Sequence, residues 1–195
     1  MPTTLARRGP LLPTLLVAGV LMVAFLIFTE FWTQKLWFDS VAFPVVFTTQ
    51  LLAEVLLFAV VFVLMAGSVA FNMWLAFRMA PIHRRTGQSA VLDRYRDLLA
   101  SNLLLGIAIP SVFFGVIAGM STASQSLPWL AWLNRTQFGQ TDAYFGLDAG
   151  FYVFELPIWS EVLGFVMSAA FFSLVAAAAV HFTTGALGVG RQGQR

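Results

Sequence analysis

The sequence predicts an all-α integral membrane protein with four transmembrane helices, because apolar residues are in excess, fall in four long stretches, and are flanked unequally by basic residues. Of the 195 residues, 59% are hydrophobic and 10% are charged, and the mean hydropathy is +0.82. A soluble domain is usually about 45–50% apolar and about 25% charged. Surface-to-volume scaling limits the apolar surface that a core of this length can bury, so lipid is the expected second solvent.

Each apolar stretch has the roughly 20 residues that a helix needs to cross a hydrocarbon core of about 30 Å. Lipid offers no partner to open backbone groups, and the stretches lack the alternation of membrane β-strands, so helices are expected. The predicted spans cover about residues 11–31, 45–71, 98–120 and 158–182, in a single transmembrane domain over residues 1–195. The connections are a short outer link (32–44), a polar inner loop (78–97) and an outer loop (121–157).

Basic residues predict the orientation, since cytoplasmic segments of membrane proteins carry an excess of lysine and arginine. Nine of the eleven lie in the two termini or the 78–97 loop, and only Lys35 and Arg135 lie on the other side. Both termini are therefore predicted to be cytoplasmic. This clustering at the ends of apolar segments explains the net charge of +2 without a nucleic-acid partner.

Tryptophans mark the predicted membrane boundaries, as an aromatic belt does. Trp74 falls at the inner boundary, and five fall at the outer one: Trp32, Trp37, Trp129, Trp132 and Trp159. Two of these belong to the stretch Leu127–Leu133, which predicts a short amphipathic helix in the outer interface.

Glu54 is the candidate for function inside the membrane. It lies about seven residues inside the second predicted span, or roughly 10 Å at 1.5 Å per residue. Ionisable groups at such depth are costly and usually face protein or water. Gln50 lies one turn earlier on the same face and could share a hydrogen bond. The alternatives are a proton- or cation-handling carboxylate and a carboxylate that snorkels outward or pairs with a neighbouring helix.

Small residues predict close helix packing. Ser111, Gly115 and Gly119 recur every four residues along the third span and include a GxxxG match, which lets helix backbones approach. Packing within the chain is favoured over homodimerisation, and Pro110 is expected to kink this helix. Gly164 and Ser168 give the fourth span a weaker face of the same kind.

The outer loop holds three acidic and several aromatic candidates. The carboxylates of Asp142, Asp148 and Glu155 could bind a divalent cation, but their spacing matches no known metal loop. We favour backbone capping by Asp142 and Asp148 instead. The aromatic residues could line a groove for an acyl chain or partner, or pack on the bilayer: they are Phe145, Phe151, Tyr152 and Phe154.

The sequence predicts no catalysis, no metal and no cofactor. It contains no cysteine, and its two histidines, His83 and His181, lie in different segments. Neither a phosphate-binding loop nor a nucleophile motif is present.

Several phrases together resemble uncharacterised protein family 0182, a set of large multi-pass membrane proteins found mainly in actinobacteria. The most specific runs from Thr141 to Pro157, although Ala143 stands where the family usually has proline. The others are Leu36–Ser40, Val46–Thr49, Asn72–Ala76, and Leu133-Asn134 followed by Phe138-Gly139. The resemblance implies location in the bacterial plasma membrane and no settled activity. It also implies that further spans and a large extracytoplasmic region follow in full-length members.

Three functional classes remain open at this point. A structural or assembly subunit of the cell envelope, with a membrane-protein partner or a second copy and with membrane lipid as neighbours, fits the small-residue faces and the aromatic loop. A transporter for an apolar or amphipathic substrate would use Glu54 and Gln50 near a broken helix. A membrane-embedded enzyme is the third class, and no residue constellation supports it.

Overall fold

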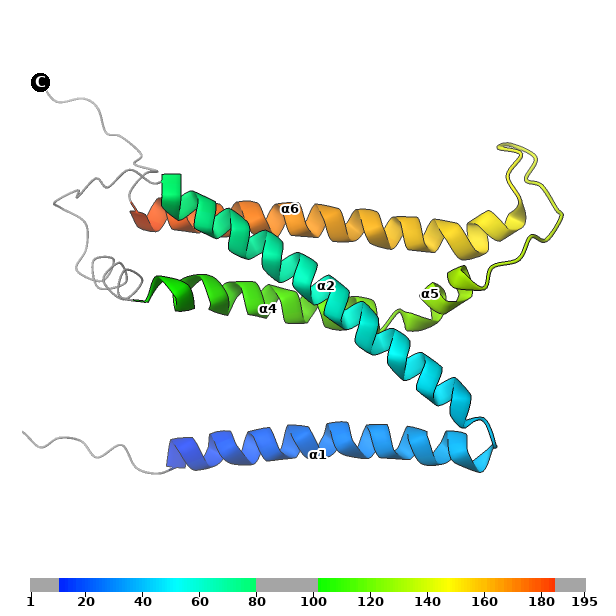
Figure 1. The fold of residues 1–195 in the computed structure, drawn as a ribbon, viewed down its shortest axis with the longest axis horizontal. Helices are drawn as coiled ribbons and strands as arrows, with labels where there is room; N and C mark the ends of the chain where they lie inside the picture. The colour runs from blue at the N-terminus through cyan, green and yellow to red at the C-terminus, as the bar shows by residue number, and fades with distance from the viewer. Residues whose placement is uncertain (1–10, 80–101, 185–195) are drawn as a thin grey trace, which may run out of the picture. The chain divides into compact units, whose positions relative to one another are not determined.

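The computed structural model describes residues 11–79 and 102–184, and nearly all of them are helical (Figure 1). Four helices are long and apolar enough to cross a membrane, which confirms the predicted fold class. The described helices are α1 (Leu11–Ser40), α2 (Pro44–Met79), α4 (Leu103–Ala123), the short α5 (Ser126–Leu133), and α6 (Leu156–Thr184), which is entered through a π-helical turn, η1 (Phe151–Glu155).

Helix α1 extends beyond its predicted span, so the expected outer link at 32–44 is much shorter than predicted. Residues 32–40 are helical, and only residues 41–43 separate α1 from α2. Pairs spaced by four residues support this polar extension: Lys35 contacts Asp39 at 2.6 Å, and Gln34 donates to Glu30 at 2.9 Å. Residues 98–101 of the third predicted span and residues 80–97 of the inner loop lie outside the described residues.

The turn after α1 follows from a Schellman motif. Ala42 has a φ of 62°, the left-handed conformation that usually follows a helix end. Its N–H donates to the carbonyl of Asp39, and the N–H of Phe43 donates to that of Phe38 at 3.0 Å. Two carbonyls at the end of α1 are thereby satisfied, and the chain reverses over three residues.

Contacts divide the chain into two compact units, with the boundary after Leu51 inside α2. In the first unit Phe47, which is 8% exposed, packs against the rings of Phe31 and Phe38 with centroids 5.5 and 5.9 Å away. Within this unit no residue of α1 is buried. Its 30 residues are long and apolar enough to cross a membrane.

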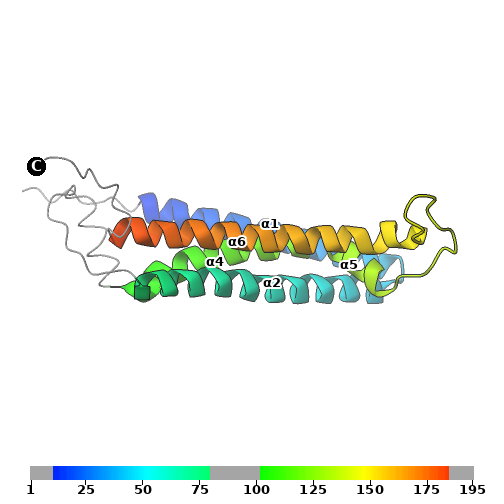
Figure 2. The same cartoon turned by 90° about the horizontal axis from the view of Figure 1, so that it is seen from above.

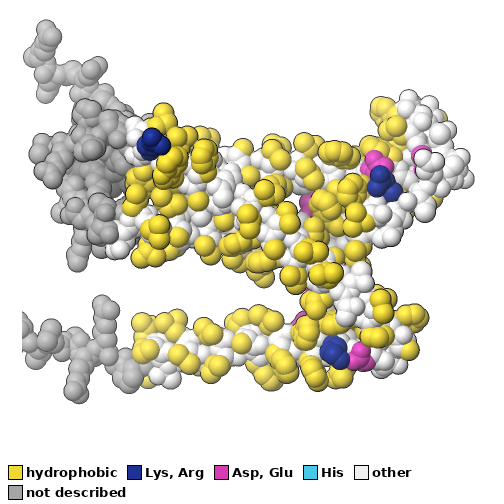
Figure 3. All heavy atoms as spheres, in the orientation of Figure 1, with side chains coloured by type: hydrophobic (Ala, Val, Ile, Leu, Met, Phe, Trp, Pro, Cys, Tyr) yellow, Lys and Arg dark blue, Asp and Glu magenta, His cyan; other side chains and the backbone are white. Residues whose placement is uncertain are grey.

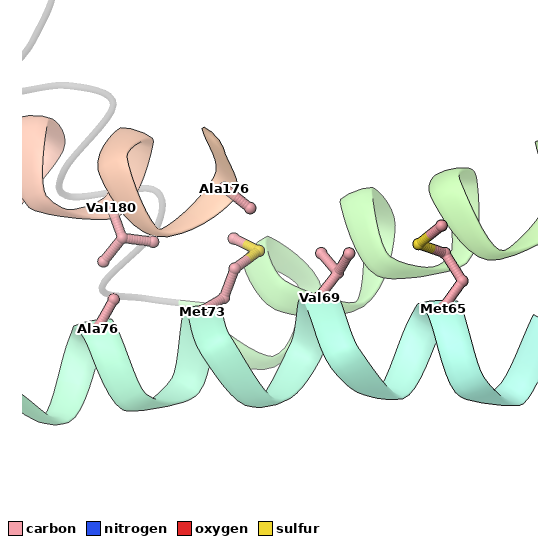
Figure 4. Close-up of a cluster of buried hydrophobic side chains, with 6 residues drawn as sticks. All are labelled: Met65, Val69, Met73, Ala76, Ala176 and Val180. Carbon is pink, nitrogen blue, oxygen red and sulfur yellow. The ribbon is translucent and has the colours of Figure 1, made fainter. Parts of the chain in front are cut away.

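The second unit contains the rest of α2 together with α4, α5 and α6. Helices α4 and α6 run in opposite directions, and α2 crosses them obliquely (Figures 1 and 2). One stripe of α2 meets α6 in a buried cluster (Figure 4), whose members are Met65, Val69, Met73, Ala76, Ala176 and Val180. The hydroxyls of Ser68 and Ser173 lie 3.0 Å apart and join α2 to α6 by a hydrogen bond. Such bonds contribute about 0.6 kcal/mol on average in membrane proteins.

The small-residue face of α4 lies against α2. A Cβ on Gly115 would stand 2.9 Å from the ring of Phe62, and one on Gly119 would stand 3.0 Å from the carbonyl oxygen of Phe58. The third member, Ser111, is 3% exposed and donates to the carbonyl of Ile107. This face therefore packs within the chain, and α4 continues as one helix through Pro110.

Large apolar side chains remain exposed along all four long helices (Figure 3). Leu104 of α4 is 82% exposed and Leu174 of α6 is 69% exposed. Exposed apolar patches larger than a few hundred Å² are rare on soluble monomers, so a hydrocarbon environment accounts for this surface.

Candidate functional site

Helix α5 contacts a carboxylate from each of two neighbouring long helices. It begins three residues after α4 ends, which places its first turn beside α4, and it presents Ser126 and Trp129 from the same face. Ser126 reaches Glu54 of α2, and Trp129 reaches Glu161 of α6. Residues far apart in the sequence thus form a polar cluster around α5.

The contact between Trp129 and Glu161 is the stronger of the two. The indole Nε1–H donates to Glu161 Oε2 at 2.8 Å, close to the ideal distance for such a bond. Both side chains are half-buried. Glu161 lies five residues into α6, about 7.5 Å from its start at 1.5 Å per residue.

Glu54 has a longer contact. Ser126 Oγ donates to Glu54 Oε1 at 3.4 Å, near the limit for a hydrogen bond, although Ser126 itself is only 2% exposed. Glu54 is half-buried and lies ten residues after the start of α2, about 15 Å along the helix. Gln50 precedes it by one turn on the same helix.

Glu161 also lines a groove between α4 and α6. The groove has a volume of about 340 Å³, and Met65 of α2 contributes to its wall. Its polar lining comes from Glu161, Ser121, Thr122 and Ser168; its apolar lining comes from Phe114, Ile117, Ala118, Gly164, Phe165 and Phe172. The rings of Phe114 and Phe172 stack with centroids 4.5 Å apart.

Gly164 and Ser168, the predicted packing face of α6, lie in the wall of this groove. A Cβ on Gly164 would meet no atom within 4 Å. Gly164 therefore makes no close helix contact within residues 11–79 and 102–184. The lack of a side chain there widens the groove instead.

In the loop between α5 and η1, residues 134–150, Asp142 caps a tight turn. Its Oδ2 accepts a hydrogen bond from the N–H of Phe145 at 2.8 Å and another from the hydroxyl of Tyr152 at 3.1 Å. The first bond closes the turn, and the second ties the loop to η1. The N–H of Phe145 holds the pKa of the Asp142 carboxyl below its usual value of 3.8, against a smaller opposing effect of partial burial.

Asp148 joins three backbone segments of the same loop. Its Oδ1 accepts from the N–H of Gly150 at 2.7 Å and of Phe138 at 3.1 Å, and its Oδ2 accepts from Gly139 at 2.8 Å. These bonds, that of Gly150 first, lower the pKa of Asp148. A Cβ on Gly150 would lie 2.8 Å from Asp148 Oδ1, which explains why glycine occupies that position.

Glu155, the third acidic candidate of the sequence analysis, forms an ion pair and does not cap the loop backbone as Asp142 and Asp148 do. Its Oε1 lies 3.3 Å from Arg135 Nε, and the guanidinium of Arg135 stacks on Trp132 at 5.3 Å. Phe151 and Phe154 line a hollow of about 410 Å³ beside this pair. Across the described parts of the chain, no three histidine or carboxylate side chains gather as metal ligands would.

The lowered pKa values predict an acid-sensitive loop. A carboxyl whose pKa is depressed by folding stabilises the fold above its unfolded pKa, near 3.8, and this contribution disappears as the pH falls through the lower folded value. We expect backbone hydrogen exchange at Gly139, Phe145 and Gly150 to accelerate below about pH 4, after correction for intrinsic rates. In Asp148→Asn, exchange at Gly139 and Gly150 should already be fast at pH 6. Exchange that is equally slow in the variant would contradict the assignment.

The residues at this site were only partly predictable. Glu54 stood out because it interrupts a long apolar run. Glu161 was not predicted, because it follows Trp159 and Ser160 at the edge of the fourth span, where carboxylates are common. The signal that could have identified it was a tryptophan in a short connecting helix, since a buried indole N–H needs an acceptor.

Four helices long and apolar enough to cross a membrane, a polar cluster around α5 and a hydrogen-bonded loop define the chain as a polytopic helical membrane protein. The chain belongs to the Uncharacterised protein family (UPF0182), whose profile matches residues 11–194. It is 44% identical to a UPF0182 protein of Streptomyces coelicolor over 193 residues, 97% of this chain and 19% of the relative. UPF0182 proteins of Salinispora arenicola (39%) and Clavibacter sepedonicus (37%) are covered to a similar extent, 19% and 20%. No solved structure matches.

The chain therefore spans about a fifth of the length of these relatives. The family resemblance predicted from sequence is confirmed.

Proposed function

We propose that the chain is a non-enzymatic assembly module of the bacterial plasma membrane. It anchors a surface on the outer side of the membrane against which a second membrane protein docks. The observation that carries this proposal is the tip of the outer loop, where Tyr144 is 92% exposed and Phe145 is 78% exposed. Two adjacent exposed aromatic side chains are typical of protein interfaces.

The rigidity of the loop supports the same function. Asp142 and Asp148 fix the backbone on both sides of this tip, and backbone bonds between Asp142 and Leu147 and between Gln140 and Ala149 close it further. A pre-organised aromatic tip loses little conformational entropy on binding. The hollow of about 410 Å³ beside Arg135 and Glu155, which Asp148 also lines, could receive a side chain from the docking protein.

The test compares the wild-type chain with a Tyr144→Ser/Phe145→Ser variant in the bacterium that produces it. Each is tagged at the carboxyl end, extracted in mild detergent and analysed by quantitative mass spectrometry. We expect the wild type to recover a membrane-protein partner in stoichiometric amount. The variant should recover about tenfold less of it, or less still, because it lacks a central aromatic contact of about 2 kcal/mol.

A matched control keeps the loop intact. Gly67→Leu changes an exposed position of α2 where a Cβ would meet nothing within 4 Å, so it should retain the partner. A cysteine introduced at Thr141, in a chain without cysteine, should react with an impermeant thiol reagent on intact cells.

Recovery of the wild type alone, or only with itself and lipid, would contradict the proposal. Transport would then be the better reading, with Glu54→Gln as the next variant.

A further inference from the structure

We propose that the groove between α4 and α6 binds one acyl chain of an aminophospholipid, whose ammonium group donates hydrogen bonds to Glu161. The groove is most polar at one end. Glu161, Ser121 and Thr122 lie at the end nearest α5, whereas Phe114 and Phe172 lie deeper along the same two helices, where Ser168 is the one polar side chain of the lining. A lipid has the same order of polarity from head group to tail.

The volume of the groove favours a single flexible chain over another helix. A helix is about 10–12 Å across with its side chains, so each ångström of its length fills on the order of 80–110 Å³. The groove holds about 340 Å³, which would accept only about 3–4 Å of helix at that cross-section. Small-ligand sites begin at about 300 Å³, and an acyl chain is the abundant narrow ligand in a bilayer.

The length of the groove matches one leaflet. Glu161 and Phe172 are eleven residues apart on α6, which corresponds to about 16 Å at 1.5 Å per residue. Half of a hydrocarbon core of about 30 Å is about 15 Å. A chain lying along the groove would therefore begin near Glu161 at the α5 end and finish beside the stacked rings of Phe114 and Phe172 near the bilayer midplane.

Glu161 can accept a donor from the lipid. Among the described residues only Trp129 donates to it, and that bond uses Oε2. A carboxylate has about four acceptor positions on its two oxygens, so Oε1 can accept an ammonium proton from the groove side. The hydroxyls of Ser121 and Thr122 lie in the same wall and could bind the phosphate or the ester oxygens.

A substitution at Gly164 tests whether the groove binds an acyl chain. It lines the groove, and a Cβ there would enter open space, so Gly164→Leu should fill the groove without disturbing the helices. The full 195-residue chain is placed in nanodiscs of phosphatidylethanolamine and phosphatidylcholine that contain a trace of phosphatidylethanolamine with a photoreactive acyl chain. We expect wild-type adducts concentrated on Ile117, Phe165 and Phe172. In Gly164→Leu these adducts should fall by about tenfold, which corresponds to about 1.4 kcal/mol.

Two variants serve as comparisons. Gly67→Leu is the same substitution at an exposed position of α2 outside the groove and should leave the adducts unchanged. Glu161→Gln should still give acyl-chain adducts in the groove, but it should abolish the preference for phosphatidylethanolamine over phosphatidylcholine. Adducts spread evenly over the exposed faces, or unchanged in Gly164→Leu, would overturn the proposal. So would crosslinking of a photoreactive residue at Ile117 to protein instead of lipid.

Discussion

Replacing Gly119 by leucine is expected to destabilise the unit formed by α2, α4 and α6 by about 1–3 kcal/mol, the usual cost of overpacking a core. A Cβ at this position would lie 2.9 Å from the ring of Phe58 and 3.0 Å from its carbonyl oxygen. The ring can rotate, but the carbonyl belongs to the backbone of α2 and cannot move alone. The helices would have to separate. The measurement is unfolding by sodium dodecyl sulfate in mixed micelles, followed by circular dichroism.

The same substitution at Gly115 and at Gly67 provides two comparisons for this result. At Gly115 a new Cβ would approach the ring of Phe62 at 2.9 Å and the Cβ of Ala66 at 3.0 Å. Both are side-chain atoms, so Gly115→Leu should cost less than Gly119→Leu. Gly67→Leu meets open space and should be close to neutral. Equal stability of Gly119→Leu and Gly67→Leu would show that α4 does not pack on α2 through this face.

Replacing Trp129 by phenylalanine is expected to cost about 1–3 kcal/mol, because it keeps an aromatic ring but removes the only N–H that Glu161 accepts among the described residues. A half-buried acceptor left without its partner loses part of its solvation without compensation. Ser126→Ala should cost less, since its contact with Glu54 measures 3.4 Å instead of 2.8 Å. The same micelle unfolding experiment ranks the two.

A double-mutant cycle separates the hydrogen bond from the loss of packing. Glu161→Met removes the acceptor and keeps a side chain of similar size. If the bond is what Trp129 contributes, Trp129→Phe should cost clearly less in the Glu161→Met background than in the wild type. A cost that is the same in both backgrounds would assign the effect to the packing of the indole.

The four long helices of the described residues, and their order, could be predicted from sequence because length and apolarity decide them. Their ends could not. Lys35 and Asp39 were assigned to a connection on polarity alone, whereas a helix that leaves the hydrocarbon can continue in water when pairs spaced by four residues support it. In α5, hydrophobicity predicted a short helix at Leu127–Leu133, and the structure begins it one residue earlier, at Ser126.

The polar cluster was less predictable, since it depends on tertiary contacts between residues 54, 126, 129 and 161. The packing role of small residues was equally hard to predict from sequence. Gly115 and Gly164 were both predicted to lie on helix-packing faces, yet Gly115 lies against α2 and Gly164 opens into a groove. Only the positions of neighbouring helices distinguish them, and no local pattern carries that information.

The π turn at Phe151–Glu155 bears on how this segment can be altered or transplanted. A π turn holds one more residue than an α turn, and each residue of an α-helix advances the chain by about 100° around the axis. Deleting one of these five residues would let the segment close as an ordinary α turn, so the loop that carries Asp142 and Asp148 would keep nearly the same direction relative to Glu161. Chimaeras that graft this loop onto another helix can therefore carry the segment either as five residues in a π turn or as one residue fewer in an α turn, whereas removing a second residue would rotate the loop by roughly 100°.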